Sequence, residues 1–96
     1  MAKLIVVYRL KAGVTAAAFE TWMASVSSPG KDRLRRLEAF TRNTHDGALE
    51  YIEIYHVAEI SSFEAGNLPA HVDACIMGEF DGLEGQPLIR VSDEPN

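Results

Sequence analysis

Residues 3–10 read Lys-Leu-Ile-Val-Val-Tyr-Arg-Leu, and their composition favours a β-strand at the start of the chain. Four of these eight residues are β-branched or aromatic, and residues 4–8 form an unbroken apolar run. Such a run is typical of a strand that is covered on both faces, because a strand with one wet face alternates apolar and polar residues. The sequence therefore predicts a buried first strand, around which the remaining elements are arranged.

A helix is expected to follow this strand, over about residues 16–27. Thr15 supplies an N-cap hydroxyl in front of three alanines, and Ser27-Ser28-Pro29-Gly30 ends the helix. The larger apolar residues recur at i, i+3, i+4 and i+7, so they form a single stripe: Phe19, Trp22, Met23 and Val26. Residues 31–36 are a basic connector with room for one helical turn.

Two more strands are predicted over residues 37–44 and 50–59, with the turn signal His45-Asp46-Gly47 between them. Side chains alternate between the two faces of a strand. In the second of these strands one face carries Tyr51, Glu53, Tyr55 and Val57, and the other carries Ile52, Ile54, His56 and Ala58. We assign the tyrosine face to the side of the sheet away from the helices.

The second helical region is interrupted. Its first part begins at a capping box formed by Ser61 and Glu64, and Gly66, Asn67 and Pro69 then break it. Asn67 caps a second part, whose buried stripe is expected to be Val72, Ile76 and Phe80, before Gly82 and Gly85 end it. A last strand over residues 86–91 and a polar tail over residues 92–96 complete the chain.

The order β-α-β-β-α-β predicts an α+β, ferredoxin-like fold over a single domain, residues 1–96. Right-handed crossovers place both helices on one face of a four-stranded antiparallel sheet. The other face then exposes apolar residues, and such a patch usually marks an interface. A small chain also buries a limited fraction of its surface alone. We therefore expect a homodimer in which two sheets pack face to face.

Composition narrows the class of protein. With 47% hydrophobic and 24% charged residues the chain is ordinary globular protein. It has no apolar run of roughly 18 residues, no export signal at its start and one cysteine, Cys75, so we expect a cytoplasmic protein without a membrane span. The net charge of −5 argues against nucleic-acid binding. Residues 1–48 carry +4 and residues 49–96 carry −9, which serves solubility or brings opposite charges together across an interface.

Three stretches of the chain resemble the dimeric α+β barrel superfamily: Ala-Lys-Leu-Ile-Val-Val-Tyr-Arg-Leu-Lys-Ala-Gly-Val-Thr at residues 2–15, the helix with Phe19, Glu20 and Trp22, and Tyr51-Ile52-Glu53-Ile54-Tyr55 with its sequel Ser61-Ser62-Phe63-Glu64. Within the superfamily the chain resembles small RedY-like, HapK-type proteins from the gene clusters of prodigiosin-like tripyrrole pigments. The resemblance implies a homodimer with a pocket between sheet and helices or inside the shared barrel. It implies no particular reaction, because related folds serve oxygenases, isomerases, cyclases and dehalogenases.

Glu53 is the most informative polar residue, because a carboxylate in the middle of a central strand must be paired, protonated or open to a pocket. As a general base it would have a raised pKa among aromatic side chains. The alternative is a structural ion pair with Arg9, Arg42 or Arg90. Either Arg42 or Arg90, if it points inward, could instead clamp a carboxylate or enolate oxygen of a ligand.

The histidines are further acid–base candidates. His45 lies in a turn and is expected to be solvated. His56 either packs under a helix or lies at the rim of a pocket. His71 lies near the start of the second helix, where the resemblance implies that superfamily members can carry a functional histidine.

The aromatic residues Tyr8, Tyr51 and Tyr55 could orient a ligand, and Trp22 is either part of the core or a wall for a flat pyrrolic molecule. No metal is expected, because His71 and Cys75 share a helix face as only two ligands and a zinc site needs three or four. No nucleotide-binding glycine motif occurs, so no cofactor is expected. The strand at residues 51–55 also lacks the motif of RNA-recognition modules.

These observations lead to two hypotheses. In the first, the homodimer binds a small, largely apolar metabolite, by resemblance pyrrole- or polyketide-like, and assists a cofactor-free proton transfer, condensation, cyclisation or oxygenation. Glu53, His56 or His71 would then be the base. In the second, the protein is a non-catalytic carrier, chaperone or accessory subunit. The sequence leaves open whether the protein is an enzyme.

Overall fold

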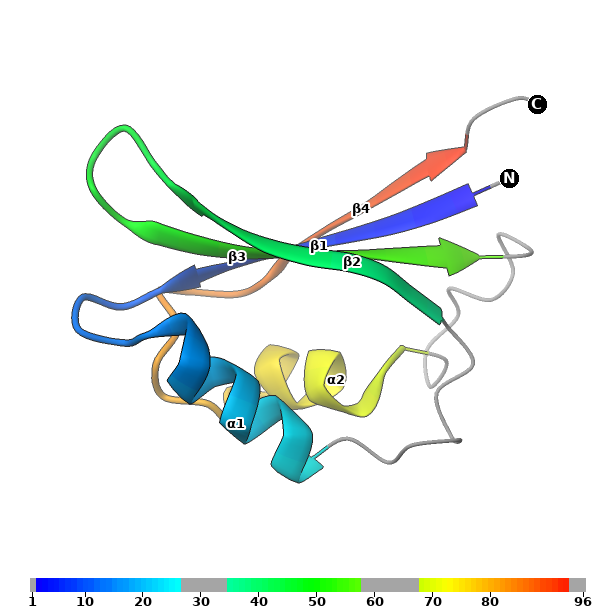
Figure 1. Ribbon diagram of the computed structural model, residues 1–96. Coiled ribbons are helices and arrows are strands. Elements are labelled where there is room, and N and C mark those ends of the chain that lie inside the picture. The colour runs from blue at the N-terminus through cyan, green and yellow to red at the C-terminus, as the bar shows by residue number, and fades with distance from the viewer. Residues whose placement is uncertain (1, 27–34, 58–67, 94–96) are drawn as a thin grey trace.

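The computed structural model describes residues 2–26, 35–57 and 68–93 (Figure 1). Its elements are β1 (Ala2–Leu10), α1 (Ala16–Val26), β2 (Arg35–Asn43), β3 (Leu49–Val57), α2 (Ala70–Ile76) and β4 (Leu88–Asp93). The predicted order β-α-β-β-α-β is confirmed. Among the described residues, neither helix has the length and apolarity needed to cross a bilayer.

The four strands form one antiparallel sheet in the order β2-β3-β1-β4. Both helices lie on the same face of this sheet (Figure 1). The architecture is therefore the ferredoxin-like α+β fold that the sequence predicts. The order places β1 and β3 in the middle, so the two strands richest in apolar residues are each paired on both sides.

The hydrophobic core lies between the sheet and the helices. β1 contributes Leu4, Val6, Tyr8 and Leu10, α1 contributes Phe19 and Met23, β3 contributes Tyr51 and Tyr55, and α2 contributes Val72 and Cys75. The rings of Tyr8 and Phe19 meet edge to face with their centroids 4.8 Å apart. This aromatic packing fastens α1 to the centre of the sheet.

The structure corrects our assignment of the two sheet faces. The face of β3 that carries Tyr51 and Tyr55 is covered by the protein's own helices, because both tyrosines are buried and Phe19 of α1 packs against Tyr51. Leu4 and Tyr8 of β1 lie opposite these tyrosines and share the covered face. The opposite side of the sheet, which we call the open face, carries an apolar patch formed by Ile5, Val7, Phe40, Ile52, Ile54 and Leu88. Alternation separates the two faces but does not say which of them the helices cover.

The second helix is shorter than predicted. Pro69, not Asn67, is its N-cap residue, and it ends at Ile76 rather than near Gly82. Ile76 is 38% exposed, so its placement in the buried stripe is wrong, and the buried positions are His71, Val72, Ala74 and Cys75. The expected capping box at residues 61–64 lies outside the described residues.

The predicted helix cap at Thr15 and the predicted turn at Gly47 are confirmed, whereas two strand bounds differ. The Thr15 hydroxyl accepts a hydrogen bond from the backbone N–H of Ala18 at 3.0 Å, which confirms Thr15 as the cap of α1. Gly47 has a φ of 85° in the turn between β2 and β3, as that turn requires. β2 begins at Arg35, two residues before the predicted start, and β4 runs to Asp93 rather than Val91.

Candidate functional site

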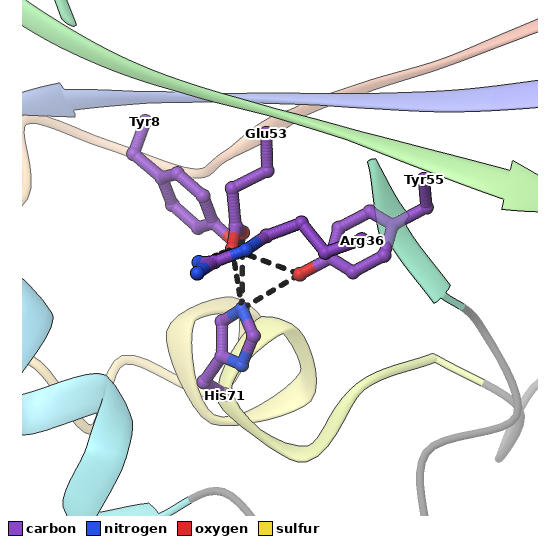
Figure 2. Close-up of polar contacts among 5 residues, drawn as sticks. All are labelled: Tyr8, Arg36, Glu53, Tyr55 and His71. Atoms are coloured by element: carbon purple, nitrogen blue, oxygen red, sulfur yellow. Dashed lines mark hydrogen bonds and ion pairs between the residues drawn. The ribbon is translucent and has the colours of Figure 1, made fainter. Parts of the chain in front are cut away.

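Five polar side chains meet between the middle of the sheet and the first turn of α2, and we call them the polar cluster: Tyr8, Arg36, Glu53, Tyr55 and His71 (Figure 2). Glu53 and Tyr55 are two residues apart on β3, so both point to the helix side. Tyr8 comes from the neighbouring strand β1, and His71 rises from α2 to meet them.

The Glu53 carboxylate is the centre of the cluster and is completely buried. Tyr8 donates its hydroxyl hydrogen to Oε1 at 2.6 Å, and Tyr55 donates to Oε2 at 2.8 Å. Arg36 adds a contact from Nη1 to Oε2 at 3.2 Å. Both carboxylate oxygens therefore have donors, which is what a buried ionised group requires.

His71 completes the cluster from the helix side. Its Nε2 lies 3.0 Å and 3.1 Å from the two Glu53 oxygens and 3.0 Å from the Tyr55 hydroxyl. Because an ionised carboxylate can only accept hydrogen bonds, these contacts assign a hydrogen to Nε2. The arrangement is a histidine–carboxylate pair, in which the carboxylate fixes the orientation of the imidazole ring.

The ionisation of the cluster follows from its contacts. Burial opposes ionisation of Glu53, but the hydrogen bond and charge of His71 and the donated hydroxyls of Tyr8 and Tyr55 outweigh it, so the pKa of Glu53 lies below its ordinary value. The raised pKa that we predicted for a base at this position is therefore wrong. Burial and the neighbouring Glu53 charge raise the pKa of Tyr8 far above its usual range, so Tyr8 stays a neutral donor.

The thiol of Cys75 is buried one helical turn after His71. Burial, followed by the charge of Glu53, raises its pKa to about 12. Cys75 is thus an un-ionised thiol that packs in the core, as predicted, because the thiolate is the reactive form of a cysteine.

Arg36 is the one member of the polar cluster that the sequence did not predict. Strict alternation along β2 would place Arg36 on the same face as Arg42, six residues later. A β-bulge between Arg36 and Glu38 shifts the register, so that Arg36 lies opposite Tyr55 and Glu38 lies opposite Ile54. This extra residue turns Arg36 to the helix side. A bulge leaves little trace in the sequence, and the predicted strand started one residue after Arg36.

Of the nine site residues that the sequence nominated, the structure brings Tyr8, Glu53, Tyr55 and His71 together. Tyr51 is buried on the same sheet face and its ring meets Phe19 edge to face, with centroids 5.3 Å apart. Trp22 is half-buried on α1 and stacks on Phe19 at 6.0 Å. Tyr51 and Trp22 therefore belong to an aromatic group beside the polar cluster, which consists of Phe19, Trp22, Tyr51 and Phe80.

The other three nominated residues lie on the open face, away from Glu53. Arg42 pairs with Glu50 through Nη2 at 2.6 Å. Arg90 is exposed on β4 opposite Ile5, and half-buried His56 lies opposite Lys3. The predicted packing of His56 under a helix is wrong, because the helices cover the tyrosine face instead. None of the three arginines proposed as partners of Glu53 is its partner, since Arg9 pairs with Asp46.

A separate open groove of about 640 Å³ lies at the end of the sheet, where the loop after β1 faces the turn between β2 and β3. Its lining includes Arg9, Lys11, Gly13, Asp46 and Leu49 but no residue of the polar cluster. Hydrogen bonds from Thr44 and Arg9, with the backbone N–H of Ala48, hold the pKa of Asp46 at about 2. Within residues 2–26, 35–57 and 68–93, no three His, Cys, Asp or Glu side chains are placed to hold a metal ion.

Comparison with known proteins shows the family to which the chain belongs. The protein family described as "REDY-like protein HapK" matches residues 2–89, which include all five members of the polar cluster. No curated protein and no solved structure gives a significant match. Since the match covers most of the chain, the protein belongs to the family of REDY-like HapK proteins.

Proposed function

We propose that this protein binds a small, largely apolar metabolite and assists a cofactor-free step on it, with Glu53 and His71 as the acid–base pair. The observation that carries the proposal is the buried contact between His71 Nε2 and the Glu53 carboxylate, at 3.0 Å. A proton that the ligand gives up would pass to His71 and leave an imidazolium beside the Glu53 carboxylate, and His71 would then return the proton to the product or to water. Membership of the HapK family favours a pyrrole- or polyketide-like ligand from prodigiosin-like pigment biosynthesis.

The aromatic group beside the cluster supports a flat ligand. Trp22 lies 4.8 Å from Phe80 and 6.0 Å from Phe19 between ring centroids, and both Trp22 and Phe80 are half-buried. Such rings provide apolar surface that a pyrrolic molecule can stack on. The ligand would contact Trp22 and Tyr51 while Tyr8 and Tyr55 hold the carboxylate in place. A cytoplasmic location fits the single free thiol of Cys75.

The test compares wild type, Glu53→Gln, the matched control Glu79→Gln and buffer. Each is incubated with bipyrrole and tripyrrole intermediates while absorbance follows product formation. Glu79 is exposed after α2, so its variant should keep wild-type turnover. Loss of the carboxylate should lower turnover by about 100-fold or more. Equal product in all samples, buffer included, would contradict catalysis.

A non-catalytic carrier is the second candidate, and one observation favours it. Both oxygens of Glu53 are occupied by donors of the protein itself, which is how a purely structural network is satisfied. Saturable binding of a bipyrrole, with no turnover in any sample, would select the carrier. In that case Glu53→Gln would change stability but not chemistry.

We also propose that a second copy of the chain covers the open face of the sheet. Phe40 and Leu88 are 42% and 49% exposed there. Between them on the two central strands, Ile5, Val7 and Ile54 are half-buried and Ile52 is 6% exposed. Apolar side chains that span all four strands are unusual on a solvated face. A twofold contact would bury this patch against its own copy, with the Arg42–Glu50 pairs at the rim.

A further inference from the structure

We infer that Arg36 is an oxyanion-binding residue and that the protein selects ligands carrying a carboxylate or a similar planar, negatively charged oxygen group. The inference deepens the proposed function, because it names the chemical class of the metabolite that would reach the Glu53–His71 pair. It rests on four observations about Arg36.

The first observation is that Arg36 is exposed to solvent whereas the rest of the polar cluster is buried. The Arg36 side chain is 48% exposed, whereas the side chains of Glu53 and His71 are 0% and 7% exposed. Tyr8 and Tyr55 are buried as well. Among the five members of the polar cluster, Arg36 is thus the one that solvent, and therefore an arriving ligand, can touch. A ligand that contacts its guanidinium lies next to the buried acid–base pair.

The second observation is that Glu53 is satisfied without Arg36. Oε1 accepts from Tyr8 and Oε2 accepts from Tyr55, and His71 Nε2 lies within 3.1 Å of both oxygens. A fourth donor is not needed to keep this carboxylate ionised in the core. The exposed guanidinium of Arg36 is therefore available for a second role besides pairing with Glu53.

The third observation is the geometry of the contact itself. Arg36 reaches Glu53 through Nη1 alone, at 3.2 Å. On the same strand, Arg42 engages Glu50 through both Nε and Nη2, at 3.1 Å and 2.6 Å. The guanidinium also interacts with the hydroxyl of Tyr51. The single, longer contact with Glu53 leaves Nε and Nη2 of Arg36 outside the ion pair. Those two donors form the edge of the guanidinium that binds a carboxylate through two parallel hydrogen bonds.

The fourth observation is the β-bulge between Arg36 and Glu38. Bulges interrupt strand pairing and re-aim side chains, often beside active sites. Without this bulge, alternation would send Arg36 to the open face with Phe40 and Arg42. The bulge gives the buried acid–base pair a permanently charged neighbour, since burial lowers the pKa of Arg36 less than the hydrogen bond and charge of Glu53 raise it.

The test measures binding of pyrrole-2-carboxylate and its neutral isostere pyrrole-2-carboxamide by isothermal titration calorimetry. Wild type should bind the carboxylate about tenfold or more tightly than the amide. Arg36→Gln should lose this preference, and Arg36→Lys should retain part of it, because an ammonium keeps the charge but not the planar fork. Arg42→Gln, on the open face of the same strand, should behave as wild type.

Equal affinities of wild type for the two probes would overturn the inference, as would a preference that survives in Arg36→Gln or an absence of carboxylate binding. Circular dichroism would establish that each variant is folded. Because binding is measured without turnover, the result is separable from the proposed catalysis. A protein that binds the carboxylate through Arg36 but turns nothing over would refute the acid–base role and leave the role of Arg36 intact.

Discussion

Glu53 shows how a chain of 96 residues can hold an ionised carboxylate inside its core. Desolvation alone would protonate such a group. Here two phenols and an imidazole, from three different elements, each donate to it, and their combined effect exceeds that of burial. The carboxylate is thus a tertiary feature, because neither Tyr8 nor His71 is near Glu53 in the sequence.

Replacing Glu53 by Gln should destabilise the protein by about 3 kcal/mol. The amide keeps the shape of the side chain, but it removes the charge that holds His71 and Arg36 and presents an N–H₂ group to donors. Urea unfolding followed by circular dichroism measures the change, with Glu79→Gln as a control that should lie within about 0.5 kcal/mol of wild type. A loss below about 1 kcal/mol would show that the network contributes little to folding.

Stability should also fall on acidification, in a way that depends on Glu53. Its pKa is lower in the folded than in the unfolded protein, so the native state binds fewer protons. The stabilisation is therefore complete above the unfolded pKa of about 4.3 and is lost as the pH falls through the lower folded value. Unfolding curves between neutral pH and about pH 3 should be steeper in pH for wild type than for Glu53→Gln. Identical pH slopes would contradict the lowered pKa.

At the scale of single elements, α2 illustrates how local backbone chemistry sets the position of a site. Glu79 N–H bonds to the carbonyl of Ala74 at 2.9 Å and Gly78 N–H bonds to that of Cys75 at 3.1 Å, which is a Schellman ending. Gly78 adopts the left-handed conformation that this ending needs, with a φ of 77°. The helix therefore stops after two turns, and His71 is fixed in its first turn.

Gly78→Ala should cost about 1 kcal/mol. No atom lies within 4 Å of the added methyl group, so the cost is the strain of a positive φ and not a clash. Gly78→Asn should cost less, because asparagine tolerates this conformation better. Thermal unfolding of the three proteins gives the ranking, and an alanine variant as stable as wild type would mean that the helix end adjusts freely.

At the scale of the whole molecule, the sheet separates two different surfaces. The helix side holds the core and the polar cluster, whereas the apolar patch of the open face lies on the side of the sheet away from both helices (Figure 1). Correcting the face assignment moves the proposed interface from the tyrosines to Ile5, Val7 and Ile54. The polar cluster then lies within one subunit, so the acid–base pair does not depend on the partner.

Ile54→Arg should therefore convert the protein from dimer to monomer while leaving it folded. Sedimentation equilibrium should give about twice the chain mass for wild type and the chain mass for the variant, since a charge buried in an apolar interface is costly. Ile76→Arg, on the exposed side of α2, is the control and should remain dimeric. A wild-type monomer at micromolar concentration would refute the shared interface. Tyr55→Arg should instead unfold the subunit, because Tyr55 lies in its core.

The sequence by itself determined the order of elements and the antiparallel sheet with its helices on one side, because periodicity, caps and turns act between neighbouring residues. It also indicated that a carboxylate at Glu53 needs polar partners. It also nominated His71, Tyr8 and Tyr55. Only the tertiary structure decided which apolar face the helices cover, since both faces of β3 are apolar enough to be buried. It likewise decided which arginine pairs with Glu53. A β-bulge turns Arg36 toward Glu53, and a bulge depends on pairing between strands rather than on any single residue.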